Sequence, residues 1–149
     1  NNAVLQPSCP ADFSVPRFEA GKVLVLPIYP GMPVASLRPL LQADGIEGVI
    51  LQTYGVGNPP DADPEFMALL NDAKERDVLV MNTTHCHTGH MAQGAYASGH
   101  ALKALGVISG NDITLEAAVA KMNIALHSDM SRAEQREWLA RPVCGELTP

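Results

Sequence analysis

Two short apolar segments, residues 48–51 and 78–81, are each followed directly by polar side chains. Such a run, bounded by turn residues, is typical of a strand buried on both faces of a parallel sheet, and we expect each strand to end with its run. Open α/β sheets bind ligands just beyond the carboxyl ends of their strands. Neutral amides and hydroxyls, with histidine and cysteine nearby, would serve binding there. The candidate residues are Gln52, Tyr54, Asn58, Thr84, His85, Cys86, His87 and His90.

Four potential metal ligands, His85, Cys86, His87 and His90, lie within six residues, and this density motivates a metal-site hypothesis. In an extended backbone, neighbouring side chains point to opposite faces, so the two flanking histidines point away from Cys86. We therefore expect no metal and no cofactor, and we interpret the histidines as loop residues. A metal site formed by His85, His87 and His90 is the alternative.

The hydroxyl and thiol groups lack the neighbours that nucleophilic catalysis needs. No orienting acid or oxyanion hole is recognisable around Cys86, and we expect a buried cysteine that serves packing. Ser98 lacks the G-x-S-x-G turn of serine hydrolases, and no base stands at a recognisable spacing from Thr83 or Thr84. The sequence therefore contains no recognisable catalytic constellation.

The composition is that of one acidic, folded domain. The 149 residues are 46% hydrophobic and carry a formal net charge of −6. Basic residues are scattered singly, so we expect no nucleic-acid partner. No apolar run has the length of a bilayer span and no signal peptide is recognisable, so we expect no membrane association. Three cysteines argue against a disulfide framework and favour a reducing, cytoplasmic compartment.

The chain divides into an N-terminal segment and an α/β domain. Residues 1–21 contain three prolines and few apolar repeats, and the chain begins without methionine. We expect a linker or extended arm there, the remnant of a connection to an upstream segment, and a domain over residues 22–149.

In that domain, strand patterns at 22–28, 48–51, 78–81 and 107–108 alternate with helical patterns. The expected helix starts are Ser36, Asp63, Tyr96, Thr114 and Ser131, and the fourth helix carries Leu115, Val119, Met122 and Leu126 on one side. The alternation predicts an α/β fold. It consists of a small parallel sheet of about four strands with helices on both faces, a Rossmann-like or flavodoxin-like three-layer domain.

Four sequence segments carry a family resemblance. They are I-Y-P-G at 28–31, Y-G-V-G-N-x-P at 54–60, N-x-T-x-C at 82–86 and G-E-L-T-P at 145–149. In order and spacing they resemble the C-terminal domain of bacterial type I (cytoplasmic) L-asparaginases, from about residue 22 to residue 149. This combination is far more specific than any one of the short motifs.

The resemblance implies a parent amidohydrolase that converts L-asparagine and water to L-aspartate and ammonia. In that family the catalytic threonines lie in the N-terminal domain, in a T-G-G-T-I-like motif and in a threonine–aspartate pair. This sequence contains neither T-G-G-T nor T-D-T. The resemblance therefore implies no catalytic residue in this chain, no activity of the chain alone, and an N-terminal asparaginase domain as its partner.

The resemblance also implies binding roles. Asn58 and Tyr54 would form part of the wall of a partner subunit's active site in a homo-oligomer. Gln52, Thr84 and Cys86 would line an effector site for L-asparagine. Allosteric family members carry, at the place of Gln52, an arginine that binds the effector carboxylate. A neutral amide cannot replace a bidentate, permanently charged guanidinium without loss, so weaker effector binding is implied.

Two alternatives stay open at this point. The first, within the same fold, is the asparaginase-like subunit of an archaeal glutamyl-tRNA amidotransferase. The second is a small metal- or amino-acid-binding module without catalysis, and the His/Cys cluster motivates it.

Overall fold

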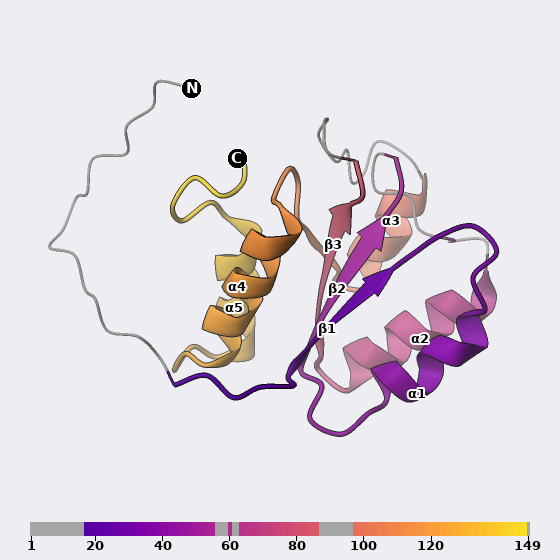
Figure 1. Cartoon of the computed structure of the whole chain (residues 1–149), viewed down its shortest axis with the longest axis horizontal. Coiled ribbons are helices and arrows are strands. Elements are labelled where there is room, and N and C mark those ends of the chain that lie inside the picture. The colour runs from indigo at the N-terminus through magenta and orange to yellow at the C-terminus, as the bar shows by residue number, and fades with distance from the viewer. Residues whose placement is uncertain (1–16, 56–59, 61–62, 87–96, 149) are drawn as a thin grey trace, which may run out of the picture.

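A four-stranded parallel sheet forms the centre of the domain in the computed structural model (Figure 1). The structure describes residues 17–148 except 56–59, 61–62, 87–96 and the side chains of 97–99. The strands are β1 (Val23–Pro27), β2 (Gly48–Thr53), β3 (Leu79–Thr84) and β4 (Ile108–Ser109), in the order β1-β2-β3-β4. All three neighbouring pairs are parallel. The predicted parallel sheet is confirmed.

Helices cover both faces of the sheet, as predicted (Figure 1). One face carries η1 (Val34–Leu37), α1 (Arg38–Leu41), α2 (Pro64–Glu75) and α3 (Ala97–Ala104), and the other carries α4 (Leu115–Leu126) and α5 (Arg132–Ala140). Right-handed crossovers between strands added in one direction all fall on one face. The second face is therefore left to α4 and α5, which follow the last strand. None of the described helices is long and apolar enough to cross a membrane.

β2 is buried on both faces, which explains its continuous apolar run. Val49 and Leu51 pack in one core cluster with residues of α1, α2 and α3. Ile50 packs in the second cluster with residues of α4 and α5. This division follows from the alternation of side chains along a strand.

Helix starts were well predicted where a capping side chain stands before an apolar stripe. The Asp63 carboxylate accepts hydrogen bonds from the backbone N–H groups of Glu65 and Phe66 at 2.9 and 3.2 Å. Ser131 and Glu134 form the expected capping box at the start of α5. Each interaction satisfies backbone donors that the first helical turn leaves without an intrahelical partner.

The helix expected to begin at Ser36 starts differently. It begins as η1 at Val34 and continues as α1, whose N-cap is Leu37. The Ser36 hydroxyl donates to the Pro33 carbonyl at 2.7 Å, and neither η1 nor α1 has a side-chain capping hydrogen bond. The serine stabilises the turn before α1 instead of capping the helix.

Only half of the apolar residues predicted to form the buried side of α4 are buried. Met122 and Leu126 are buried, but Leu115 and Val119 are only partly buried, and Ala118 and Ala125 are fully buried in their place. A Cβ at Gly48 in β2 would lie 2.8 Å from Met122 Cγ, so α4 lies very close to the sheet. Small alanine side chains permit this approach, which a search for large apolar residues overlooks.

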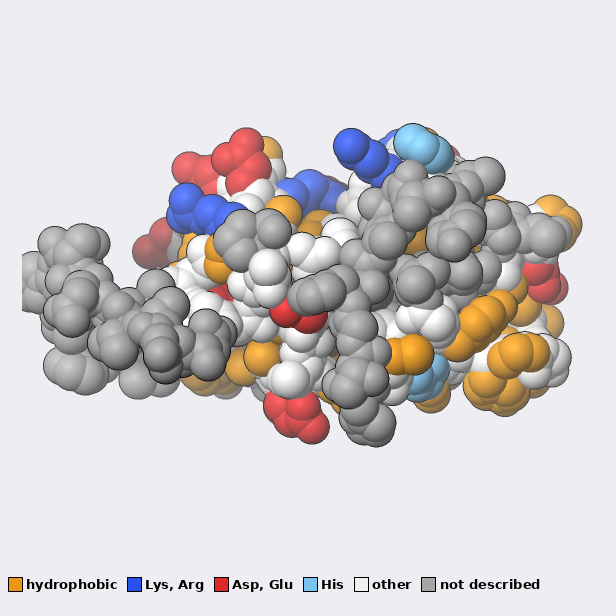
Figure 2. Space-filling view, turned by 90° about the horizontal axis from the view of Figure 1, so that it is seen from above, with side chains coloured by type: hydrophobic (Ala, Val, Ile, Leu, Met, Phe, Trp, Pro, Cys, Tyr) orange, Lys and Arg blue, Asp and Glu red, His pale blue; other side chains and the backbone are white. Residues whose placement is uncertain are grey.

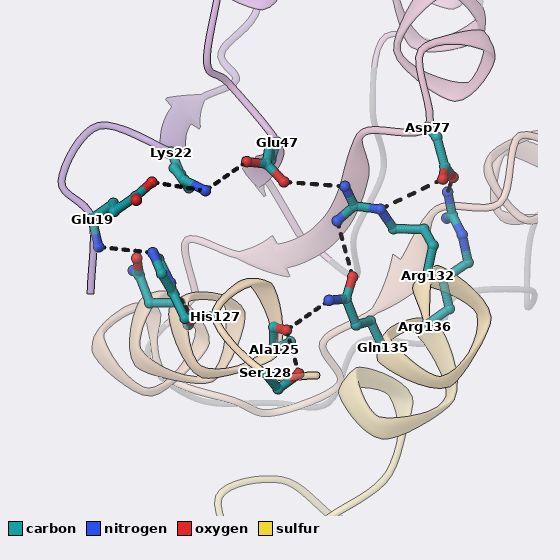
Figure 3. Close-up of polar contacts among 11 residues, drawn as sticks. Glu19, Lys22, Glu47, Asp77, Ala125, His127, Ser128, Arg132, Gln135 and Arg136 are labelled. Carbon is teal, nitrogen blue, oxygen red and sulfur yellow. Dashed lines mark hydrogen bonds and ion pairs between the residues drawn. The ribbon is translucent and has the colours of Figure 1, made fainter. Parts of the chain in front are cut away.

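Charged side chains close the amino edge of the sheet, where the strands begin (Figure 3). Lys22 pairs with Glu47 at 2.9 Å, and Arg132 of α5 bridges Glu47 and Asp77 at 3.2 and 3.5 Å. The hydrogen bond to Glu47 raises the pKa of Lys22, and the same bond lowers the pKa of Glu47. These pairs are partly exposed, so each stabilises the fold only modestly.

Candidate functional site

The strands extend further toward the candidate site than predicted. The apolar runs end at Leu51 and Met81, but β2 continues to Thr53 and β3 to Thr84. Thr53 is fully buried although it is polar. Threonine is β-branched and fits a sheet, and its hydroxyl finds partners within the ladder, so the strand does not stop at the first polar residue.

A buried polar network joins the ends of β2 and β3. The Thr53 hydroxyl lies 2.8 Å from Asn82 Oδ1 and 3.1 Å from the Thr83 carbonyl, and it donates to these acceptors. The Thr83 hydroxyl donates to the Leu51 carbonyl at 3.1 Å. Thr53, Asn82 and Thr83 are at most 1% exposed. Buried groups satisfied in this way make a rigid base under the candidate site.

Thr84 connects the two loops that follow these strands. Its hydroxyl donates to the Gly55 carbonyl at 2.8 Å and accepts from the Cys86 backbone N–H at 3.0 Å. Both contacts are to backbone groups, and neither partner can remove a proton from the hydroxyl. In the described part of the chain, Thr84 therefore has no base that would make it a nucleophile.

His85 holds three strand ends together. Its backbone N–H donates to the Thr53 carbonyl at 2.8 Å, and its Nε2 lies 3.1 Å from the carbonyl of Ile28, just after β1. A carbonyl only accepts, so Nε2 carries the proton in this contact. No group of three potential ligands that could hold a metal occurs among the described residues, which include His85 but not His87 or His90.

The predicted site residues lie along one edge of the sheet but not on one face. Gln52 pairs in register with Thr83, and Thr53 pairs with Thr84. Side chains alternate along a strand, so Gln52 points to the side of α4 and α5, and Thr84 to the side of α1 and α2. Among the described residues, the Gln52 amide has no side-chain hydrogen bond.

Two further predicted residues follow the strand ends. Tyr54 is 36% exposed and available to a neighbour. Cys86 is exposed, so the expectation of a buried cysteine was wrong. The Thr84 hydroxyl bonds the Cys86 backbone in the loop beyond the sheet, which keeps the thiol out of the core. Asn58 lies outside the described residues.

The exposed surface near this edge is partly apolar. Figure 2 looks onto it and shows hydrophobic side chains gathered toward the end of the molecule where α1 and α2 lie. Tyr29, which follows β1, is 54% exposed. Together with Tyr54 it makes this edge suited to contact with another protein surface.

Among the described residues, this edge offers neutral polar groups and no nucleophile paired with a base, and sequence comparison gives the family of the chain. The family model of the Glutaminase/Asparaginase C-terminal domain matches residues 22–139. The chain belongs to this family. The predicted resemblance is thereby confirmed at the level of the domain.

Relatives of this asparaginase C-terminal domain agree with that assignment. The chain is 37% identical over 125 residues to L-asparaginase 1 of Escherichia coli, covering 84% of this chain and 36% of the relative. It is 40% identical over 126 residues to the human 60 kDa lysophospholipase, covering 84% of this chain and 22% of the relative. The crystal structure of L-asparaginase I from Vibrio cholerae matches with a TM-score of 0.85 and 38% identity, covering 96% of this chain and 42% of that chain.

The asparaginase C-terminal domain also occurs in another kind of protein. A glutamyl-tRNA(Gln) amidotransferase subunit of Methanococcus maripaludis is 30% identical over 126 residues, covering 85% of this chain and 29% of the relative. The chain thus spans well under half the length of the curated relatives it matches.

Proposed function

We propose that this chain is the C-terminal domain of an L-asparaginase, an amidohydrolase that converts L-asparagine and water to L-aspartate and ammonia. The observation that carries the proposal is the family match over residues 22–139 in a sequence without T-G-G-T or T-D-T. The strand-end hydroxyls contact only backbone and amide groups, which fits a domain without a nucleophile of its own. The N-terminal asparaginase domain, the chain's partner in this proposal, supplies the reacting groups.

In this proposal the carboxyl edge of the sheet faces a second subunit. Tyr54 and Asn58 form part of the wall of the partner's active site in a homo-oligomer. The exposed Tyr29 and Tyr54 provide apolar surface for that contact. The cytoplasm is the proposed compartment, because Cys86 and Cys144 are exposed free thiols and a reducing environment preserves such thiols.

The release of ammonia tests whether the reacting groups lie in the N-terminal domain and not in this chain. We expect no ammonia from L-asparagine with this chain alone. In a joined protein, this chain replaces the 125 matched residues of E. coli L-asparaginase 1. We expect this joined protein to hydrolyse asparagine more than about a hundredfold faster than either part alone. The remaining part of the E. coli enzyme, tested alone, is the control. Asparagine hydrolysis by this chain alone would overturn the proposal.

An effector site for L-asparagine at the same edge is the finer part of the proposal. Gln52, Thr84 and Cys86 are its candidate residues, and Gln52 stands in place of an effector-binding arginine. We expect Gln52→Arg to tighten asparagine binding to this chain by about tenfold or more, since a bidentate charged contact replaces a neutral one. Isothermal titration measures this affinity, and Gln42→Arg, a change on the exposed end of α1, is the matched control. Equal affinities in all three proteins would contradict the site.

The amidotransferase subunit is the second candidate, since the Methanococcus relative is 30% identical over 126 residues. The two functions differ in the acceptor of the released ammonia. In the protein that joins this chain to its own N-terminal domain, hydrolysis of asparagine without any tRNA favours the asparaginase, and a requirement for charged tRNA favours the amidotransferase.

A further inference from the structure

The arm that leads into β1 is attached to α4 through a histidine. The Glu19 backbone N–H donates to His127 Nε2 at 2.8 Å, and His127 Nδ1 lies 2.8 Å from the Asn123 carbonyl (Figure 3). The Phe18 ring contacts the same imidazole edge to face, with ring centres 5.4 Å apart. Residues 17–19 of the arm are therefore joined to the end of α4 at one imidazole.

The two contacts define the protonation state of His127. A carbonyl oxygen only accepts, so Nδ1 must carry a proton to bond Asn123. An amide N–H only donates, so Nε2 must be unprotonated to bond Glu19. Only the neutral ring with its proton on Nδ1 satisfies both contacts. A protonated ring would direct a second N–H at the N–H of Glu19.

Beyond the imidazole, the described residues give this part of the arm one further polar contact, the ion pair of Glu19 with Lys22 at 3.1 Å. An open groove of about 400 Å³ separates the arm from α4, and it is lined by Phe18, Glu19, Ala20, Ala120, Asn123 and Ile124. Phe18 is 50% exposed. The far end of the arm is fixed separately, because Lys22 pairs with Glu47 at 2.9 Å. Loss of the His127 bond would therefore detach residues 17–19 from α4 and leave Glu19 paired with Lys22 at 3.1 Å.

We propose that His127 is a pH-sensitive latch that holds the arm against α4 when neutral and releases it when protonated. Histidine is the side chain whose charge changes most readily between about pH 5 and pH 8. Protonation turns the acceptor at Nε2 into a donor and breaks the bond to Glu19. The latch is closed at neutral pH and opens as the pH falls.

Charged residues on the two segments that meet at the ring include Glu19 and Lys22 of the arm and Asp129 after α4. Lys22 is bound to the carboxylates of Glu19 and Glu47. The latch lies at the surface, where Phe18 is 50% exposed, so acid should open it without unfolding the domain.

The consequence for catalysis rests on the proposed function, because the arm would join this domain to its catalytic partner. Release of residues 17–19 would then loosen the connection between the two domains as the pH falls. The latch itself is independent of that function and can be measured in this chain alone.

Amide exchange of Glu19 and the chemical shifts of the His127 ring, measured by NMR from about pH 7.5 to about pH 5, test the latch. We expect the Glu19 protection factor, corrected for the intrinsic pH dependence of exchange, to fall about five- to tenfold as the pH is lowered. The midpoint of this fall should equal the midpoint of the change in the His127 ring chemical shifts. His127→Gln keeps a neutral acceptor and an N–H donor, so protection should not change with pH. His127→Phe keeps the ring contact to Phe18 but no acceptor, so protection should be low at every pH.

Each outcome decides for or against the latch. Constant Glu19 protection in the unmodified chain, or different midpoints for the ring and the amide, would refute it without any variant. A His127→Gln protein with the original pH dependence would show that another group titrates. None of these results depends on asparagine hydrolysis, so a failure of the proposed function leaves the test intact.

Discussion

Glu146→Gln should lower the free energy of unfolding by about 3 kcal/mol, the largest loss that we expect from a single conservative change. Glu146 lies in the C-terminal segment and pairs with Lys121 of α4, whose side chain is only 4% exposed. The Lys121 ammonium also bonds the Arg141 carbonyl and lies 5.3 Å from the centre of the Trp138 ring. Glutamine removes the countercharge and leaves a buried ammonium with only neutral partners, the Arg141 carbonyl and the Trp138 ring, which is costly.

Denaturation in urea measures this loss, and Glu137→Gln is the matched control. Glu137 is exposed on α5, and the same chemical change there should cost less than about 0.5 kcal/mol. Replacing both members of the buried pair, with Lys121→Met and Glu146→Gln, should recover much of the loss because no charge stays buried. Equal effects of the two single glutamine substitutions would mean that the pair does not stabilise the fold.

The same pair gives the stability of the domain an acid dependence. Burial by itself would raise the pKa of Glu146, but the hydrogen bonds from Lys121 and from the Cys144 N–H outweigh it and hold this pKa well below the ordinary 4.5. A carboxyl group with a lowered folded-state pKa stabilises the fold above its unfolded pKa and loses that contribution as the pH falls. The difference in stability between the unmodified chain and Glu146→Gln should therefore narrow below about pH 4.5.

Gly110→Ala should cost about 2 to 3 kcal/mol, the second of the two largest effects. A Cβ at Gly110 would lie 2.7 Å from the backbone oxygen of Asn82 and 3.0 Å from methyl groups of Thr83 and Ile113. The Gly110 N–H already donates to that Asn82 oxygen at 2.8 Å, which fixes the backbone of β3 next to the glycine. A backbone atom within the sheet cannot move aside without breaking this contact.

Gly48→Ala is the informative comparison, measured by the same urea denaturation. Its new Cβ would meet Met122 Cγ at 2.8 Å, a contact just as short, but with a flexible side chain. Met122 can adopt another rotamer, so we expect a loss of about 1 kcal/mol. A larger loss at Gly48 than at Gly110 would contradict the view that the backbone of Asn82 limits the space.

The fold could be predicted because its signals are local. The apolar runs of β2 and β3 reflect strands buried on both faces, and Asp63 marks the start of α2 within a few residues of the stripe it precedes. Such features depend on sequence neighbours, so periodicity and capping rules suffice to place them. The handedness of the crossovers, together with the observed strand order, then places α1, α2 and α3 on one face.

The details of the candidate site could not be predicted in the same way, because they depend on contacts between distant segments. Thr53 stays in its strand through a hydrogen bond to Asn82, which is 29 residues away. Cys86 is exposed in the loop after β3, where its backbone N–H bonds the Thr84 hydroxyl, and no short sequence pattern marks this turn away from the core. A lysine at position 121 suggests a solvated helix face. Its burial is explained only by its pairing with Glu146, which lies 25 residues later in the chain.

The two ends of the sheet differ in chemistry. Salt bridges between the strand starts and α5 occupy one end, and mostly neutral polar groups with exposed tyrosines occupy the other. Charge substitutions at the first end could therefore change heat tolerance while leaving the proposed recognition surface at the second end intact. In the same way, substitutions at the second end could alter what the domain binds without a loss of stability at the first end.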